Sequence, residues 1–379
     1  YREAGRDQDY GITEFATAEA SDPFELVRQV EAGNLLVASL CRRLGEILPE
    51  ARKMAVFRHN VCHVTRTSWA THCNVLTTSS ASTLVAQLVP HLVSKVIFAG
   101  GGGFALDGPF RFSLAPRMAT FTSVINRHTT HERPLLNTRE MSHCSVAARR
   151  QHLIGFEILC SHRARLLDIG TTMLVTRLID AGLSPGTEMD LEDPILALHP
   201  FCADTTCRPE VRRRGGRTAV TAVHIQRHCL RQVMEHLHSD FMPSWAGRLC
   251  ALWAETLDLI EAGAPDSIAD MLDWGMKHTI FRDHAEKCGG NWESSRDTLL
   301  ELDLRFGELD GGLFERLDSL GQLTHRVPGI AHISDGITTP PADTRAHPRG
   351  NAILELRRAG RQGTAHWDRV TDTSARRHV

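Results

Sequence analysis

One long apolar stretch limits what this chain can fold into. Residues 84–99 are almost continuously apolar and partly β-branched, and four consecutive glycines, Gly100 to Gly103, end the run. A run without a regular polar side is typical of an element that is buried on all sides. We therefore predict a buried helical turn followed by a sheet strand, and a large core around this segment.

The four glycines have two interpretations. A glycine-rich turn after a strand lets backbone amides approach a phosphate. However, neither a Lys-Ser/Thr pair nor a recognisable helix start follows Gly103. The segment is thus not a Walker loop, and a flexible hairpin turn is the favoured interpretation.

Helical and strand patterns divide the chain unevenly. Asp22, Pro23 and Glu25 form a helix-start signal ahead of an amphipathic pattern that ends near Pro49. The second half is mostly helical, and its tryptophans are mainly expected in the core. The other predicted elements are strands at 54–57, 110–114 and 120–125, a helix at 170–182, a hairpin turn at 214–217, a helix reaching Leu237, and core positions at Trp253, Leu257, Ile260, Ile268, Leu272 and Trp274. This pattern indicates an α+β fold.

Composition excludes several classes of protein. The chain has 379 residues, is 42% hydrophobic, and carries a formal charge of -2, so it has no overall basic field that would favour nucleic acid as a partner. No apolar run is long enough for a membrane span, and the N-terminus lacks a secretory signal. We expect a cytoplasmic protein with a large core.

The ten cysteines do not form a disulfide or zinc framework. No CxxC pair is present, and Cys62-His63 and His72-Cys73 lack the spacing of a structural zinc site. We expect mostly reduced, buried thiols.

Three polar regions remain as candidates for chemistry. Residues 5–19 contain four carboxylates, which form either a solvated tail or part of a cation site. A basic cluster at 133–152 suits either a local anionic ligand or a solvated face, and a proline-fixed turn at 339–350 carries two arginines. Trp367 follows this turn in a polar setting that suits an exposed anchor or a stacking surface for a base.

Taken in order, these segments resemble the family of Pup ligases and depupylases, within the glutamine-synthetase-like carboxylate-amine ligases. The resemblance covers most of the chain. The matching motifs are Glu14-Phe15-Ala16-Thr17-Ala18-Glu19, His59-Asn60-Val61, Ser68-Trp69-Ala70-Thr71-His72-Cys73-Asn74, Leu92-Val93-Ser94-Lys95, Asn137-Thr138-Arg139, Arg149-Arg150, Gly170-Thr171, Ile225-Gln226, Asp273-Trp274, Leu302-Asp303-Leu304 and Pro340-Pro341 through Thr344-Arg345-Ala346 to Arg349-Gly350. The ending Trp367-Asp368 followed by Val370 is more similar to the depupylase (Dop) branch.

The resemblance implies a curved antiparallel sheet packed against helices, forming a cradle for ATP and Mg²⁺. It implies a glutamine-synthetase-like catalytic domain over residues 1–350, and a remnant or start of a small C-terminal domain over 351–379. Asp9 resembles the essential catalytic aspartate, and Glu14 resembles a metal ligand. Asp7 stands where the family has a tyrosine near the metal, and its carboxylate is also expected to bind Mg²⁺. The residues that resemble ATP contacts are Arg6, Thr17, Arg139, Arg345, Arg349 and Trp367.

The resemblance leaves three functions open. The first is an ATP- and Mg²⁺-dependent hydrolase that cleaves an amide or isopeptide bond of a Pup-like protein modifier or of a pupylated substrate. The second is ligation of that modifier to lysine with ATP hydrolysis. The third is a nucleotide-binding regulatory homologue without catalysis, which is motivated by Cys73 in place of a family glutamate and by the changed segment 140–145. The family strand with a Glu-x-Glu metal motif is absent from this sequence, and such a strand upstream of Tyr1 would favour an active enzyme.

Overall fold

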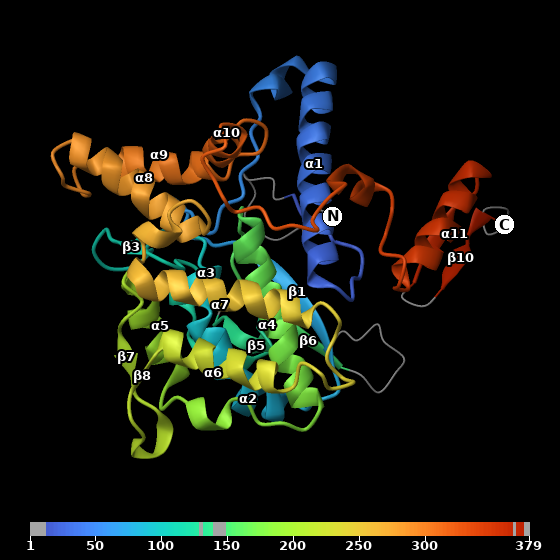
Figure 1. The fold of residues 1–379 in the computed structure, drawn as a ribbon. Coiled ribbons are helices and arrows are strands. Elements are labelled where there is room, and N and C mark those ends of the chain that lie inside the picture. The colour runs from blue at the N-terminus through green and yellow to red at the C-terminus, as the bar shows by residue number, and fades with distance from the viewer. Residues whose placement is uncertain (1–12, 129–131, 139–148, 367–368, 375–379) are drawn as a thin grey trace. The chain divides into compact units, whose positions relative to one another are not determined.

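The computed structural model describes residues 13–128, 132–138, 149–366 and 369–374. The chain divides into two units, a larger one formed by residues 55–327 and a smaller one formed by residues 1–54 with 328–379. Figure 1 labels most of the helices and strands of both. No helix in the described ranges is long and apolar enough to cross a membrane.

The larger unit contains a four-stranded sheet with the order β1-β6-β5-β4. These strands are β1 (Thr71–Thr77), β4 (Ser123–Asn126), β5 (Pro134–Asn137) and β6 (Arg149–Phe156). β6 runs antiparallel to β1 and β5, whereas β4 runs parallel to β5. The α+β class is therefore confirmed, but the sheet is mixed rather than wholly antiparallel as expected.

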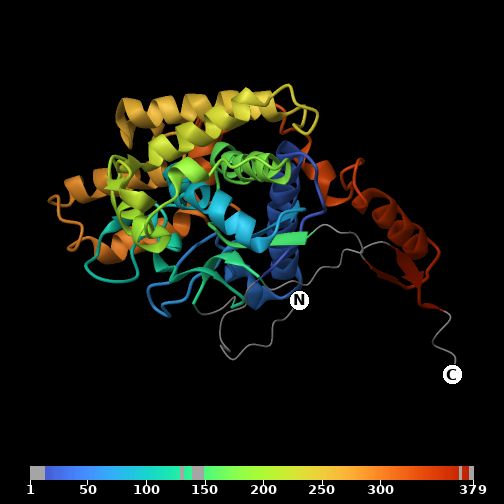
Figure 2. The same ribbon diagram turned by 90° about the horizontal axis from the view of Figure 1, so that it is seen from below.

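Helices cover one face of this sheet in two layers. Helices α2 (Ala81–Ser94) and α4 (His162–Asp180) contact the strands, and α6 (Ala222–Glu235) and α7 (Ala246–Gly263) pack behind them. Figure 2 shows this succession from α7 to the strands. The remaining helices of the unit are α3 (Val96–Ala99), α5 (Pro194–Ala203), α8 (Asp273–Lys287), α9 (Arg296–Phe306) and α10 (Leu313–Ser319), with short 3-10 turns at Met118–Thr120, Thr187–Met189, Arg214–Gly216 and Asp266–Ile268.

The apolar run at 84–99 is buried as predicted, but it contains no strand. Ser80 caps α2 by accepting a hydrogen bond from the Thr83 N–H at 3.1 Å, and α3 continues directly after Lys95. Because α2 lies between the sheet and the outer helices, its side chains are apolar on nearly every side. Periodicity cannot distinguish such a helix from a buried strand, which explains the wrong assignment.

The tetraglycine opens the hairpin of β2 (Gly103–Phe104) and β3 (Phe112–Ser113). A Cβ atom on Gly101 would lie 2.3 Å from Nδ2 of Asn60 and 2.8 Å from Oε2 of Glu157. The glycine is required by this close packing. The prediction that the four glycines form a flexible hairpin turn is therefore wrong, because they lie before the turn of this hairpin and are buried.

Several local predictions are confirmed and one is wrong. Strands β3 and β4 lie at two of the predicted positions, and α4 covers all but the last two residues of the predicted helix at 170–182. The glycine turn at 214–217 joins β7 (Glu210–Val211) to β8 (Val220–Thr221). Residues 54–57 form only a single bridge, between Phe57 and Glu308, rather than a strand. The six predicted core positions between Trp253 and Trp274 are all at most 2% exposed.

The smaller unit is built on α1 (Pro23–Ile47). Asp22 caps this helix by accepting a hydrogen bond from the Phe24 N–H at 2.7 Å, as predicted, while Glu25 pairs with Arg28. The predicted turn at 339–350 is partly helical. The unit also contains 3-10 turns at Pro49–Lys53 and Ile333–Ile337, helix α11 (Ala346–Arg358), and the hairpin of β9 (Gly363–Ala365) and β10 (Val370–Asp372).

Candidate functional site

The two faces of the sheet in the larger unit have different chemistry. Cys73 is buried on the helix-covered face, where burial raises the pKa of its thiol to about 12 and the charges of Lys95 and Asp168 act on it. The neighbouring residue His72 points away from it and meets His152 edge-on, with 5.2 Å between ring centroids. The two residues of the His72-Cys73 pair therefore do not converge on one metal ion.

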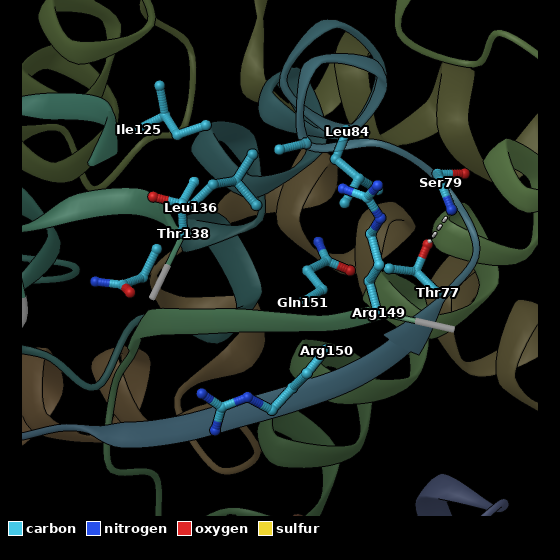
Figure 3. Close-up of a pocket in the computed structure, with 11 residues that line it drawn as sticks. Thr77, Ser79, Leu84, Ile125, Leu136, Thr138, Arg149, Arg150 and Gln151 are labelled. Atoms are coloured by element: carbon cyan, nitrogen blue, oxygen red, sulfur yellow. Dashed lines mark hydrogen bonds between the residues drawn. The ribbon is translucent and has the colours of Figure 1, made fainter. Parts of the chain in front are cut away.

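The side chains of the adjacent residues Arg149 and Arg150 also point to opposite sides of their strand. Figure 3 shows their side chains leaving β6 on opposite sides. Arg149 and Arg150 both line a pocket of about 60 Å³, whose lining also includes Thr77, Asn137 and Gln151.

Two arginines of this unit lie close together where β5 begins. Arg117 is buried, and its guanidinium donates to Oγ of Ser68 at 2.8 Å and to the carbonyl oxygen of Ile154 at 2.9 Å. Burial, with a smaller contribution from the positive charge of Arg133, lowers the pKa of Arg117 to about 9. Arg117 was not recognised in the sequence, because nothing in the run around it marks a buried arginine.

Arg133 is half-buried, and burial lowers the pKa of its guanidinium. Its Nε atom is buried without a hydrogen-bond partner. Within the described ranges, no carboxylate forms an ion pair with it. The sequence places Arg133 in a basic cluster, and the structure shows that it differs from Arg117, whose guanidinium is held by two acceptors.

A buried carboxylate ties this region to the tetraglycine. Glu157 accepts hydrogen bonds from the backbone N–H of Gly101 at 2.5 Å and of Arg117 at 2.9 Å. Burial raises the pKa of Glu157 to about 7, although these hydrogen bonds act in the opposite direction. Glu157 thus joins two loops to the end of β6, a role with no signature in the sequence.

Many motif residues that carry the family resemblance have structural roles. Lys95 forms a buried ion pair with Asp168 at 2.6 Å, and Asp303 forms one with Lys277 at 2.8 Å.

Other motif residues form hydrogen bonds within the core. Asn60 exchanges hydrogen bonds with the backbone of Ile158, and Gln226 donates to Ser94. Asp273 accepts hydrogen bonds from the N–H groups of Cys160 and Ser161. These contacts join separate elements of the core. Their presence therefore supports a shared fold more directly than a shared reaction.

Four of the predicted site residues lie in the described part of the smaller unit. Glu14 and Thr17 are exposed. Arg345 and Arg349 both pair with the carboxylate of Glu19, at 3.4 and 3.6 Å. The Thr344 hydroxyl also donates to the Glu19 carbonyl oxygen at 3.0 Å. The structure thus brings the two arginines together around an internal carboxylate.

The other predicted site residues, Arg6, Asp7, Asp9, Arg139 and Trp367, lie outside the described residues. Within the described ranges, no three His, Cys, Asp or Glu side chains are grouped in a way that would hold a metal ion. Glu14 and Asp7 as metal ligands, and Asp9 as the catalytic group, therefore stay predictions.

Comparison with known proteins connects this structure to one family. The family described as Pup-ligase protein matches residues 7–371. A Pup deamidase/depupylase of Mycolicibacterium smegmatis is 30% identical over 370 residues, which cover 96% of this chain and 72% of that protein. A Pup–protein ligase of the same organism is 29% identical over 364 residues, which cover 93% of this chain and 79% of the ligase. The two relatives, which have different activities, are thus almost equally similar to this chain.

Solved structures share the fold. The Pup ligase PafA in complex with ADP matches with a TM-score of 0.82 and 23% identity, over 95% of this chain and 82% of that chain. PafA in complex with the modifier Pup matches with a TM-score of 0.79 and 21% identity, over 94% of this chain and 76% of that chain.

Proposed function

We propose a function from one premise, which is that this chain belongs to the Pup-ligase protein family. Within the family, we propose an ATP- and Mg²⁺-dependent hydrolase that cleaves an amide or isopeptide bond at the carboxyl terminus of a Pup-like modifier. The observation that carries the proposal is the similarity to a Pup deamidase/depupylase along 96% of the chain. The sequence ending at Trp367, Asp368 and Val370 supports the same branch.

The proposed reaction replaces the nitrogen on the modifier's carbonyl carbon by the oxygen of water. The C–N bond breaks, and the nitrogen leaves with a proton as ammonia or as a lysine amine. We assign Asp9 to the carbonyl, because a carboxylate there can act as a nucleophile or as a base towards water. Conversion of the modifier's terminal Gln to Glu would be the simplest version of this reaction.

The proposed cofactor contacts agree with the chemistry of the side chains. Asp7 and Glu14 offer the oxygen ligands that Mg²⁺ prefers, and the exposure of Glu14 leaves it accessible. Bound Mg²⁺ would neutralise phosphate charge. Arg6, Arg139, Arg345 and Arg349 are proposed for the nucleotide phosphates, Thr17 for a further polar contact, and Trp367 for the adenine side. For Arg345 and Arg349, Glu19 would orient the guanidiniums or exchange with a phosphate.

The hydrolase proposal is tested on the full chain with a Pup-like protein that ends in Gln, in the presence of Mg-ATP. We expect the modifier to gain the mass difference between an NH₂ and an OH group without stoichiometric ADP release. Asp9→Asn should abolish the change, whereas Asp240→Asn, at an exposed position of the larger unit, should not. An unchanged modifier with stoichiometric ADP release would contradict hydrolysis.

Ligation is the second candidate, because several Pup–protein ligases are 29% identical to this chain over 93% of its length. In that reaction the terminal carboxylate of the modifier receives a phosphoryl group from ATP, and a lysine amine displaces phosphate. A modifier that ends in Glu, mixed with a lysine-bearing acceptor protein, separates the two reactions. An isopeptide-linked product with one ADP per bond would favour ligation.

A non-catalytic homologue is the third candidate, and Cys73 motivates it. The thiol lies beside the Lys95–Asp168 pair on the helix-covered face. Because Cys73 stands where the family pattern has a glutamate, this chain lacks the carboxylate expected at this position. Calorimetry with Mg-ATP tests this alternative: tight binding without turnover supports it, and turnover that Asp9→Asn abolishes excludes it.

A further inference from the structure

We propose that the pocket between the start of α2 and the sheet of the larger unit binds a small carboxylate that carries a short aliphatic chain. The pocket is independent of the proposed reaction, because none of its lining residues is among those assigned to nucleotide, metal or catalysis. A cavity, a buried amide that lines it, and the charge and apolar surface around that amide together define the ligand class.

Several elements of the larger unit enclose this pocket. Leu84 of α2, Ile125 of β4 and Leu136 of β5 line it, together with Arg149 and Gln151 of β6. Residues two positions apart in a strand point to the same face, and Figure 3 shows the side chains of Arg149 and Gln151 on the same side of β6. The volume of about 60 Å³ exceeds the roughly 10–15 Å³ that one water molecule needs. The pocket therefore has room for a small organic group.

The polar end of the pocket contains a buried amide. Gln151 is 4% exposed, and its Oε1 atom accepts a hydrogen bond from the hydroxyl of Thr176 in α4 at 3.4 Å. Among the described residues, none accepts a hydrogen bond from its Nε2 atom, which is also buried. A buried donor without an acceptor is unfavourable, so a ligand oxygen in the pocket would be stabilised by this amide.

Arg149 gives the same end of the pocket a positive charge. Of the described residues that line the pocket, none is an Asp or a Glu. The acid closest in the hydrogen-bond network is Asp180, whose Oδ1 atom accepts from the hydroxyls of Thr77 and Ser79 at 2.6 Å each and does not line the pocket. A guanidinium and an amide donor on one strand face match the two oxygens of a carboxylate.

The rest of the pocket wall is mainly apolar. Leu84 and Leu136 are buried, whereas Ile125 is 39% exposed and places the solvent-accessible side of the pocket at β4. An aliphatic chain can contact these side chains while its carboxylate reaches Gln151. Phosphate would place its additional oxygens against the apolar wall, so a carboxylate with an aliphatic chain matches the pocket better.

Propionate and propionamide test the proposal, because they have the same size and differ in charge. Each is titrated into the full chain, and binding is followed by saturation-transfer NMR of the ligand's methyl group. Propionate should bind at least about tenfold more tightly than propionamide, as expected for a charge-assisted contact. It should also bind about fourfold more tightly than acetate, because one more CH₂ group is buried. Propionamide has an N–H donor in place of one oxygen, so it also tests the direction of the Gln151 amide.

Arg149→Met should weaken propionate binding by about tenfold and reduce the difference between propionate and propionamide. Gln151→Met should weaken the binding of both, and thermal unfolding without ligand shows whether each variant is folded. Arg212→Met is the matched control, because Arg212 is an exposed arginine outside the pocket lining, and it should keep wild-type affinity. Equal affinity of the wild type for propionate and propionamide, no binding of propionate by the wild type, or equal loss in Arg149→Met and Arg212→Met would each overturn the proposal.

Discussion

A buried ion pair of the larger unit and a partly exposed group of charges in the smaller unit differ in their access to solvent. In the larger unit, the Lys277–Asp303 pair is closed off from solvent, with side chains 5% and 1% exposed. In the smaller unit, Glu19 and its two arginines are between 19% and 42% exposed. A buried pair cannot exchange partners without leaving a charge in the core, whereas a partly exposed pair can. The first arrangement fixes a fold, and the second is suited to ligand exchange.

The largest effect is expected from Asp303→Ala. Burial lowers the pKa of Lys277, and the charge and hydrogen bond of Asp303 act in the opposite direction, so Asp303→Ala would leave the lysine buried without its counterion. We expect about 3 to 5 kcal/mol of lost unfolding free energy, measured by denaturant titration. The double variant Lys277→Met with Asp303→Leu should recover most of the lost unfolding free energy, because neither charge is then left in the core. A loss no larger than that of the exposed control Asp240→Ala would remove the distinction between the units.

The next effect is a pH dependence that originates at Glu157. Its pKa is about 7 in the folded chain, against an ordinary value of 4.5, so between these values the folded chain holds a proton that the unfolded chain has released. Unfolding free energy should therefore rise as pH falls from about 7 to 4.5, by up to about 3 kcal/mol from this group. The difference between wild type and Glu157→Gln, followed by thermal unfolding across this range, isolates the contribution. If the unfolding free energies of the wild type and of Glu157→Gln change in parallel with pH, Glu157 is not the origin of the pH dependence.

Gly101→Ala tests the close packing in the same unit. The new Cβ would overlap Asn60 and Glu157, and we expect a loss of about 1 to 3 kcal/mol in unfolding free energy. Gly247→Ala is the control, because Gly247 has open space around its Cβ position and lies in α7. That change should be neutral or stabilising. Equal losses in both variants would argue against steric overlap.

The smallest stability effect is expected from Arg349→Gln in the smaller unit. Its partly exposed pair with Glu19 should contribute less than about 1 kcal/mol to unfolding free energy. Affinity for Mg-ATP, measured by calorimetry, should nevertheless fall if this arginine contacts phosphate. A stability loss comparable to that of Asp303→Ala would make the pair structural, and the two units would then be alike.

Much of the helical fold could be predicted from the sequence. The Asp22 cap and the spacing that follows it located α1, and the apolar positions from Trp253 to Trp274 are in the core. The strand assignments were weaker, since the apolar run before Gly100 is a buried helix. The parallel pairing of β4 with β5 could not be predicted, because it depends on tertiary contacts that leave no local periodicity.

Less of the candidate functional site could be predicted from the sequence. Motif similarity identified Lys95, Asp273 and Asp303, but these residues hold the core together. It also selected Arg345 and Arg349 without indicating that they share Glu19. Arg117 and Glu157 were not recognised, because their importance comes from burial and from partners that are distant in the sequence.

The contacts of Glu157 also bear on how the chain folds. Its acceptor atoms bind N–H groups that are 56 and 40 positions earlier in the sequence, and Asn60 is paired to Ile158 across 98 positions. Such contacts form only after long loops have closed, and proteins rich in them fold slowly. We therefore expect the end of β6 to acquire its native environment late, after the local helices have formed. Substitutions around Glu157 should then accelerate unfolding more than they slow folding.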